Sequence, residues 1–122
     1  MPRRRVRGRG SVGTKSVRDS ACEEQFEKFE WDEQKRQRNI EEHGIDFEDA
    51  ATVFLRPYLR RRSDRNAETR YMAIGCLRDV EIAVVYTIRV GVCRIISARR
   101  ARTNEREAYH KAISDQAEAG QD

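Results

Sequence analysis

The sequence has little of what most metal, disulfide or membrane sites need. Its 122 residues include only three cysteines, two histidines and one tryptophan. Cys22, Cys76 and Cys93 have no CxxC spacing and no nearby histidine pair, which argues against a structural zinc site or a disulfide framework. No apolar run approaches the ~20 residues of a membrane span, and the arginine-rich start lacks the apolar segment of a secretory signal. We therefore expect a cytoplasmic protein with no metal and no cofactor.

The positive charge is concentrated at the start of the chain. Residues 1–20 hold seven Lys or Arg and one acid, whereas residues 21–122 hold eighteen Lys or Arg and twenty acids. Because residues 1–27 contain few large apolar side chains, they cannot offset chain entropy, and we predict a disordered basic tail. The tail could be a nucleic-acid-attracting arm, an organelle-targeting leader or the product of an upstream start codon. The predicted domain covers 29–113, and 114–122 should fray.

Two helices are predicted after a short strand at 29–31. Asp32 is a good N-cap for a helix that ends at His43, with Gly44 as a left-handed stop. Asp46 caps a second helix, which Pro57 ends. Apolar residues recur in this second helix at the spacing of one buried face, namely Phe47, Ala50, Ala51 and Phe54.

The second half of the domain reads as four strands and a helix. Apolar runs separated by short turns predict an antiparallel four-stranded meander. Arginines mark its first strand as an edge strand, and a helix follows over 103–113. The fold class is therefore α+β, with helices on one sheet face and, if the other face is open, a platform edged by arginines. The predicted strands are 58–63, 71–76, 82–88 and 92–98.

Arginines at the end of the last strand suggest an anion site. A guanidinium held by a rigid strand can position a phosphate, because its planar fork matches two phosphate oxygens. Arg99 and Arg100 lie where the strand ends. Arg94 lies inside the strand, so it either pairs with an acid such as Glu68 or points to the open face.

A polar stripe on the first helix is the second candidate feature. Lys35, Asn39 and His43 are four residues apart and share one helix side. Histidine is the natural proton carrier near neutral pH, although His43 could equally serve the negative end of the helix. Tyr109 either packs the last helix on the sheet or reaches the site. We expect the stripe and the strand-end arginines to converge on one phosphate.

With these residues in place, the chain resembles the BrnT family of bacterial toxins, which is similar in fold to the RelE/ParE ribonuclease-type toxins. The resemblance covers roughly residues 29–110. It depends on Phe29-Glu30-Trp31-Asp32, Lys35, Asn39, His43-Gly44, Phe47-Glu48, Ala50, Val53-Phe54, Glu68, Arg70-Tyr71, Gly75, the run from Arg94 to Ala101, Glu105-Arg106 and Tyr109.

The resemblance implies the toxin of a type II toxin–antitoxin system, a metal-independent endoribonuclease that cleaves RNA and inhibits growth. Its implied partner is a BrnA-like ribbon-helix-helix antitoxin, through which alone it would reach operator DNA. On this reading the site comprises catalytic His43, Arg94, Arg99 and Lys35, and RNA-binding Arg100, Asn39, Arg70 and Tyr109.

A second interpretation is a non-catalytic module that binds the antitoxin and tunes autoregulation. Two departures from the family pattern favour it: Glu42 replaces a frequent lysine, and the loop Asp64-Arg65-Asn66 lacks a frequent histidine. A third interpretation, a basic-tailed DNA-binding protein, lacks a convincing helix-turn-helix.

Overall fold

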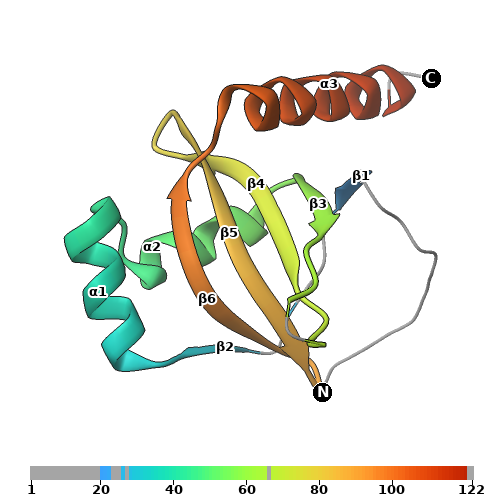
Figure 1. Cartoon of the computed structure of the whole chain (residues 1–122). Helices are drawn as coiled ribbons and strands as arrows, with labels where there is room; N and C mark the ends of the chain where they lie inside the picture. The colour runs from blue at the N-terminus through green and yellow to red at the C-terminus, as the bar shows by residue number, and fades with distance from the viewer. Residues whose placement is uncertain (1–19, 23–25, 27, 66, 121–122) are drawn as a thin grey trace.

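One sheet organises the fold, and the helices lie against its two faces (Figure 1). The computed structural model describes residues 20–22, 26, 28–65 and 67–120. Within them the sheet has six strands in the order β1-β3-β4-β5-β6-β2. The strands are β1 (Ser20–Cys22), β2 (Lys28–Trp31), β3 (Tyr58–Arg62), β4 (Tyr71–Leu77), β5 (Val80–Arg89) and β6 (Val92–Arg100).

The sheet is mixed, and the predicted α+β class is confirmed. Neighbours from β3 to β6 are antiparallel, and β1 pairs antiparallel with β3. β2 runs parallel to β6 at the opposite edge. The predicted four-stranded meander is therefore only part of the sheet, and the prediction that β3 is an edge strand is wrong, because β1 pairs with it. A strand that pairs with a distant partner leaves no local turn signal in the sequence.

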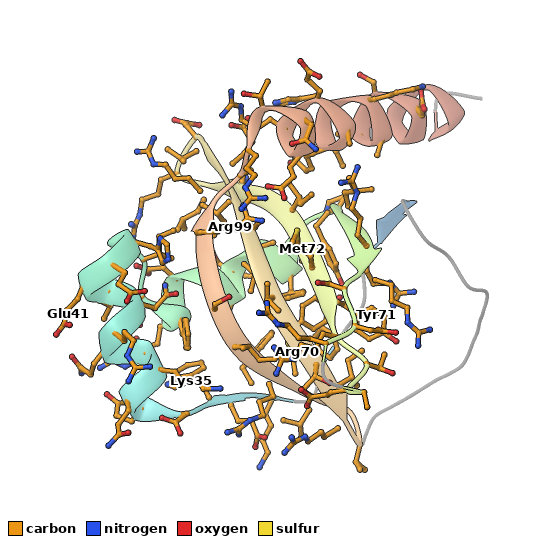
Figure 2. All side chains as sticks on the ribbon, viewed as in Figure 1. Lys35, Glu41, Arg70, Tyr71, Met72 and Arg99 are labelled. Carbon is orange, nitrogen blue, oxygen red and sulfur yellow. The ribbon has the colours of Figure 1, made fainter. Side chains whose placement is uncertain are left out.

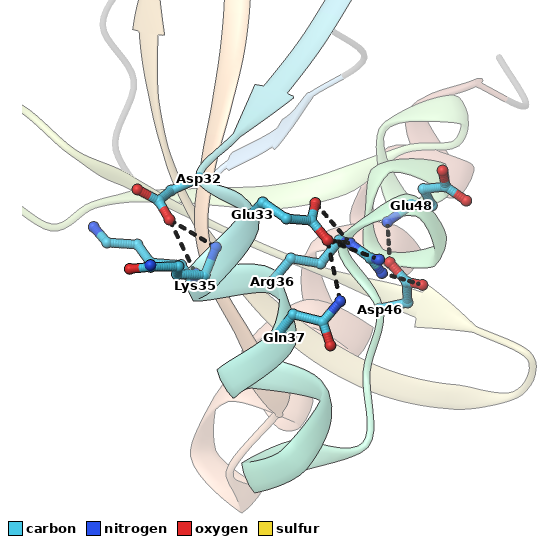
Figure 3. A network of polar contacts seen from close by, with 8 residues as sticks. Asp32, Glu33, Lys35, Arg36, Gln37, Asp46 and Glu48 are labelled. Carbon is cyan, nitrogen blue, oxygen red and sulfur yellow. Dashed lines mark hydrogen bonds and ion pairs between the residues drawn. The ribbon is translucent and has the colours of Figure 1, made fainter.

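Both predicted N-caps are confirmed (Figure 3). α1 (Glu33–His43) begins after Asp32, whose carboxylate accepts the backbone N–H groups of Gln34 and Lys35 at 2.8 and 3.2 Å. Gly44 ends α1 with a left-handed φ of 70°. Asp46 caps α2 (Phe47–Ala50) in the same way.

A side-chain bridge fixes the two helix starts relative to each other. The Arg36 guanidinium donates to Glu33 in the first turn of α1 and to Asp46, the cap of α2, at 3.1 Å (Figure 3). This bridge sets the direction in which α2 leaves α1.

The first sheet face carries the larger core. After α2 the chain tightens into the 3-10 helix η2 (Ala51–Leu55) rather than continuing as the predicted α-helix, as short helix ends commonly do. Of the predicted apolar stripe, Phe47, Ala50 and Phe54 are buried, whereas Ala51 is only partly covered. The Phe54 ring packs edge-on against Tyr86 at 4.9 Å between centroids. We call this side the helix face.

α3 (Thr103–Gly120) packs on the second face of the sheet. It covers Leu59, Ile74 and Ala83, and it crosses only one end of the sheet (Figure 1). The helix runs past its predicted end at residue 113, because 114–120 include alanine and glutamate, which favour helix. Among the described residues, no helix lies on the rest of this face.

Most of the predicted disordered tail, 1–27, lies outside the described residues. Two of its parts are described. β1 pairs with β3, and the Phe26 ring packs edge-on against Phe29 and Phe54 with centroids 5.8 and 5.4 Å away.

Candidate functional site

The part of the second face that α3 leaves uncovered is the candidate site, and we call it the open face. Side chains of residues paired across strands point to the same face, and those two apart along a strand do so as well. Met72, Val85 and Ser97 pair across β4, β5 and β6 and form the centre of the open face. In Figure 2, Arg99, Met72 and Arg70 follow one another from below α3 toward the far end of the sheet.

A row of polar residues crosses the far end of the open face. Thr87 pairs with Arg94, and Arg94 pairs with Glu30 on β2. Arg70 precedes Tyr71, which pairs with Tyr86, so Arg70 lies across from Thr87 on its other side. We call Arg70, Thr87, Arg94 and Glu30 the arginine row. In the middle of the arginine row, the Thr87 hydroxyl donates to the Thr69 carbonyl at 2.8 Å and so ties β5 to the segment before Arg70.

Each arginine of the row is paired with a carboxylate. Arg94 donates to Glu30 at 3.0 Å, and Arg70 donates to Glu68 at 2.8 Å. Both pairs are partly open to solvent. Glu68 also meets Arg89 at 3.6 Å. The hydrogen bond from Arg70 holds the pKa of Glu68 below its ordinary value, so Glu68 is ionised at neutral pH.

The arginine row and its surroundings nevertheless keep a positive excess. Arg89 and Lys28 both pair with Val92 at the end of the sheet, one row beyond Arg94. Four cations, namely Lys28, Arg70, Arg89 and Arg94, therefore lie at this end of the sheet, and the three arginines among them share two carboxylates, Glu30 and Glu68. This end of the open face attracts anions.

Arg99 lies at the other end of the open face and is held internally. Its guanidinium donates to both carboxylate oxygens of Glu105 at 2.9 Å. Glu105 also accepts the backbone N–H of Arg102 at 2.8 Å, which completes the start of α3. Only 7% of the Glu105 side chain is exposed, so this pair joins β6 to α3.

The expectation that the α1 stripe and the strand-end arginines converge on one phosphate is therefore wrong, as the positions of Arg94, Arg99 and Arg70 indicate. All three donate to carboxylates of the same chain. Arg70 and Arg94 share one row, whereas Arg99 pairs with Ala83, four residues before Thr87 on β5. That spacing separates Arg99 from the row by about 13 Å along the strands.

Asn39 holds α1 on the sheet. It is 5% exposed, its amide group donates to the Ile45 carbonyl at 2.9 Å, and its carbonyl oxygen accepts from the Ala98 backbone N–H at 3.0 Å. Because all of these contacts are to backbone, the predicted RNA-binding role does not fit this placement.

We expect Asn39→Ala to lower the free energy of unfolding by about 2–3 kcal/mol, because it leaves two buried backbone groups without their partner. Urea denaturation measures the change. Lys35→Ala on the same helix is the control and should stay within about 0.5 kcal/mol of wild type, as for exposed surface sites. Equal effects of the two substitutions would contradict the role of Asn39 in holding α1 on the sheet.

Tyr109 is also a packing residue. It lies in the smaller core between α3 and the sheet with Leu59, Ile74 and Ala83. Burial, together with a hydrogen bond to Cys76, raises the pKa of Tyr109 to about 12. Of the two roles open from the sequence, the structure places Tyr109 in packing, away from the open face.

The three remaining predicted residues are a lysine, a histidine and an arginine whose side chains are exposed. Lys35 and His43 lie on α1, and Arg100 is the last residue of β6. Arg100 pairs with Ile82 of the larger core, so its side chain leaves the sheet on the helix face, opposite to Arg94. Lys35 and Arg100 have no side-chain partner among the described residues, and His43 meets Glu42 only at 3.9 Å.

Sequence reasoning missed four residues that bond to the arginines of the second sheet face or lie beside them. Glu30 and Thr87 carry no signal of their own until the strand register is known, and the sequence suggests Glu68 only as a partner of Arg94. Glu105 could have been found, because an acid three residues after a helix cap is the capping-box spacing.

In the described part of the chain, no group of three or more His, Cys, Asp or Glu is placed to hold a metal ion. Among the same residues, no helix has both the length and the apolar character to cross a membrane. Cys76 and Cys93 are free thiols.

Comparison with known proteins gives one match. The family described as "Ribonuclease toxin, BrnT, of type II toxin-antitoxin system" matches residues 31–105, which is more than half of the chain. The matched segment runs from the end of β2 to Glu105 in the first turn of α3, and it includes every strand from β3 to β6. No curated protein matches the sequence.

Proposed function

The chain belongs to the BrnT family of ribonuclease toxins of type II toxin–antitoxin systems, and from that premise we propose that it is a metal-independent endoribonuclease whose RNA lies across the open face. Its growth-inhibiting activity is masked by a BrnA-like ribbon-helix-helix antitoxin. Contact with operator DNA occurs through that antitoxin. The fold in this proposal is the RelE/ParE-like one.

Metal-free RNA cleavage has three chemical needs. A base takes the 2′-hydroxyl proton, cations stabilise the charge on the pentavalent phosphorane, and an acid protonates the leaving 5′-oxygen. Arginine supplies only the second of these, because it stays protonated. We assign this role to Arg70 and Arg94, whose positions in the sheet lie on opposite sides of Thr87.

The observation that carries the proposal is the positive excess on a rigid surface. Four cations and two carboxylates lie together where β4, β5, β6 and β2 are hydrogen-bonded side by side. Electrostatic stabilisation works best when the donors are fixed before the reaction, and a sheet provides that fixation. Lys28 and Arg89 extend the positive end for the RNA backbone.

The second candidate function is a non-catalytic, antitoxin-binding module. Its support is the pairing of Arg70, Arg94 and Arg99 with carboxylates of the same chain, together with the departures from the family pattern at Glu42 and in the loop Asp64-Arg65-Asn66. Asp64 itself pairs with Arg62 at 2.9 Å.

The deciding experiment uses the purified full chain with RNA and excess chelator, beside induced expression in a bacterium. We expect RNA fragments in both settings and growth arrest in the second. Unimpaired growth with folded protein and intact RNA would contradict the endoribonuclease and favour the non-catalytic, antitoxin-binding module. Activity that disappears with chelator would contradict metal independence.

His43→Ala tests where proton transfer occurs. Asn39, one turn earlier on α1, bonds to Ala98, which lies four residues beyond Arg94 on β6. His43 is therefore more than about 10 Å from the level of the arginine row. We expect His43→Ala to keep cleavage within about threefold of wild type, whereas loss of a general acid or base costs about 10²–10⁴-fold. A loss of that size would locate the chemistry near Arg100 instead.

A further inference from the structure

We propose that Glu30 and Glu68 occupy the phosphate positions of the RNA and are displaced when RNA binds, so that the toxin's own carboxylates weaken its hold on RNA. This inference rests on the proposed function, because it concerns the RNA surface assigned there. It predicts a gain of RNA affinity on removing an acidic residue from the open face.

Each of the two carboxylates lies where a phosphate would bind to the same arginine. Glu30 meets Arg94 at 3.0 Å and Glu68 meets Arg70 at 2.8 Å, the separations of charge-assisted hydrogen bonds. A guanidinium binds carboxylate and phosphate oxygens with the same planar fork. A phosphate of the RNA and the internal carboxylate therefore compete for the same N–H groups.

Exposure separates these two pairs from the third. In the Arg94–Glu30 and Arg70–Glu68 pairs, 38% and 34% of the glutamate side chains are exposed, against 7% for Glu105. Solvent screens a partly exposed pair, and its partners exchange at little cost. Neither Glu30 nor Glu68 bonds to a helix-start amide as Glu105 does. The first two pairs can therefore open without disturbing the fold.

The charge balance also favours displacement at this end of the face. Glu68 is shared between Arg70 and Arg89, which lie 2.8 and 3.6 Å from it, so one carboxylate serves two guanidiniums. A bound phosphate adds negative charge to a surface whose cations outnumber its acids. Arg99 and Glu105 balance each other and offer no such excess.

The experiment measures binding of a short mixed-sequence 2′-O-methyl oligoribonucleotide to the full chain, because this probe lacks the free hydroxyl that cleavage requires. We expect Glu30→Gln and Glu68→Gln each to tighten binding by about two- to fivefold at low salt, the range that one part-exposed ion pair corresponds to. The slope of log affinity against log salt should steepen by about 0.7 for each substitution.

Glu33→Gln is the matched control. Glu33 also pairs with an arginine, Arg36, at 3.0 Å, but it lies on α1 away from the open face. The substitution changes the net charge by the same amount, so tighter binding by Glu33→Gln would reveal a general charge effect and overturn the inference. Unchanged or weaker binding by both Glu30→Gln and Glu68→Gln would overturn it as well.

Failure of the inference and failure of the proposed function are distinguishable. If the wild-type chain cleaves RNA and the two variants bind the probe as the wild type does, only the displacement idea is lost. If no variant and no wild-type protein binds the probe, both ideas fall. If the variants bind more tightly and RNA stays intact in the cleavage test, displacement stands and the enzyme does not.

Discussion

Arg94→Ala is expected to lower RNA cleavage by about 10²–10³-fold, the usual cost of removing one preorganised donor to a developing negative charge. Arg94 lies inside β6 with its partners set by the register, Thr87 on one side and Glu30 on the other. The strand therefore fixes the backbone of Arg94, and the Glu30 carboxylate holds its guanidinium in the RNA-free protein. Arg70→Ala should have a comparable effect from the opposite side of the row.

The measurement is single-turnover cleavage with the fold checked by circular dichroism and thermal unfolding. Arg38→Ala is a suitable control, because Arg38 is exposed on α1 and plays no part in the open face. It removes the same charge and should leave cleavage near wild type. Equal activity of Arg94→Ala and Arg38→Ala would remove the arginine row from the mechanism.

Local signals in the sequence were sufficient for the helix starts and the first core. Asp32 and Asp46 cap their helices, and Gly44 adopts the left-handed conformation that ends α1. These features depend on a few neighbouring residues, whose backbone needs are met within one turn. Phe47 is buried as the helical spacing predicts, and Phe54 is buried as well although the chain tightens into η2 before it.

The candidate site depends on contacts that spacing cannot reveal. Arg94 meets Glu30, 64 residues away in sequence, only because β2 runs parallel to β6. A register shift between Val85 and Tyr86 further decides which residues share a face. One residue of slip would turn Arg94 to the opposite side of the sheet.

Polar residues at regular helical spacing were the least reliable guide to function. Lys35, Asn39 and His43 are spaced to share a side of α1, but only Asn39 faces β6 and is buried, whereas Lys35 and His43 are exposed. A stripe of this kind predicts a common direction and leaves open whether solvent or protein lies there. Asn39 satisfies backbone groups that no sequence pattern identifies as needing a partner.

The second prediction with a large expected effect concerns how the free energy of unfolding depends on pH through the Arg99–Glu105 pair. Bonding to Arg99 lowers the pKa of Glu105 from 4.5 to about 2, against the opposing effect of burial. Because the folded-state pKa lies below the unfolded one, the pair stabilises the fold above pH 4.5. That contribution disappears as the pH falls from 4.5 to about 2. A shift of this size corresponds to about 3 kcal/mol at neutral pH.

We therefore expect Glu105→Gln to lower the free energy of unfolding by about 3 kcal/mol at pH 7, with the difference from wild type closing toward pH 2. Urea unfolding of both proteins across this pH range measures it. Glu105→Ala should cost about 3–5 kcal/mol, since it leaves the mostly buried Arg99 guanidinium without its partner.

The difference between the two proteins isolates Glu105 from the other acids whose pKa values are lowered, among them Glu68 and Asp64. Those groups titrate in both proteins and cancel in the comparison. If Arg99 instead served RNA directly, Glu105→Gln would free it and tighten RNA binding with little loss of stability. A parallel fall in stability at every pH would show that the lost contribution is packing rather than ionisation, and Arg99 would then have no electrostatic role at the start of α3.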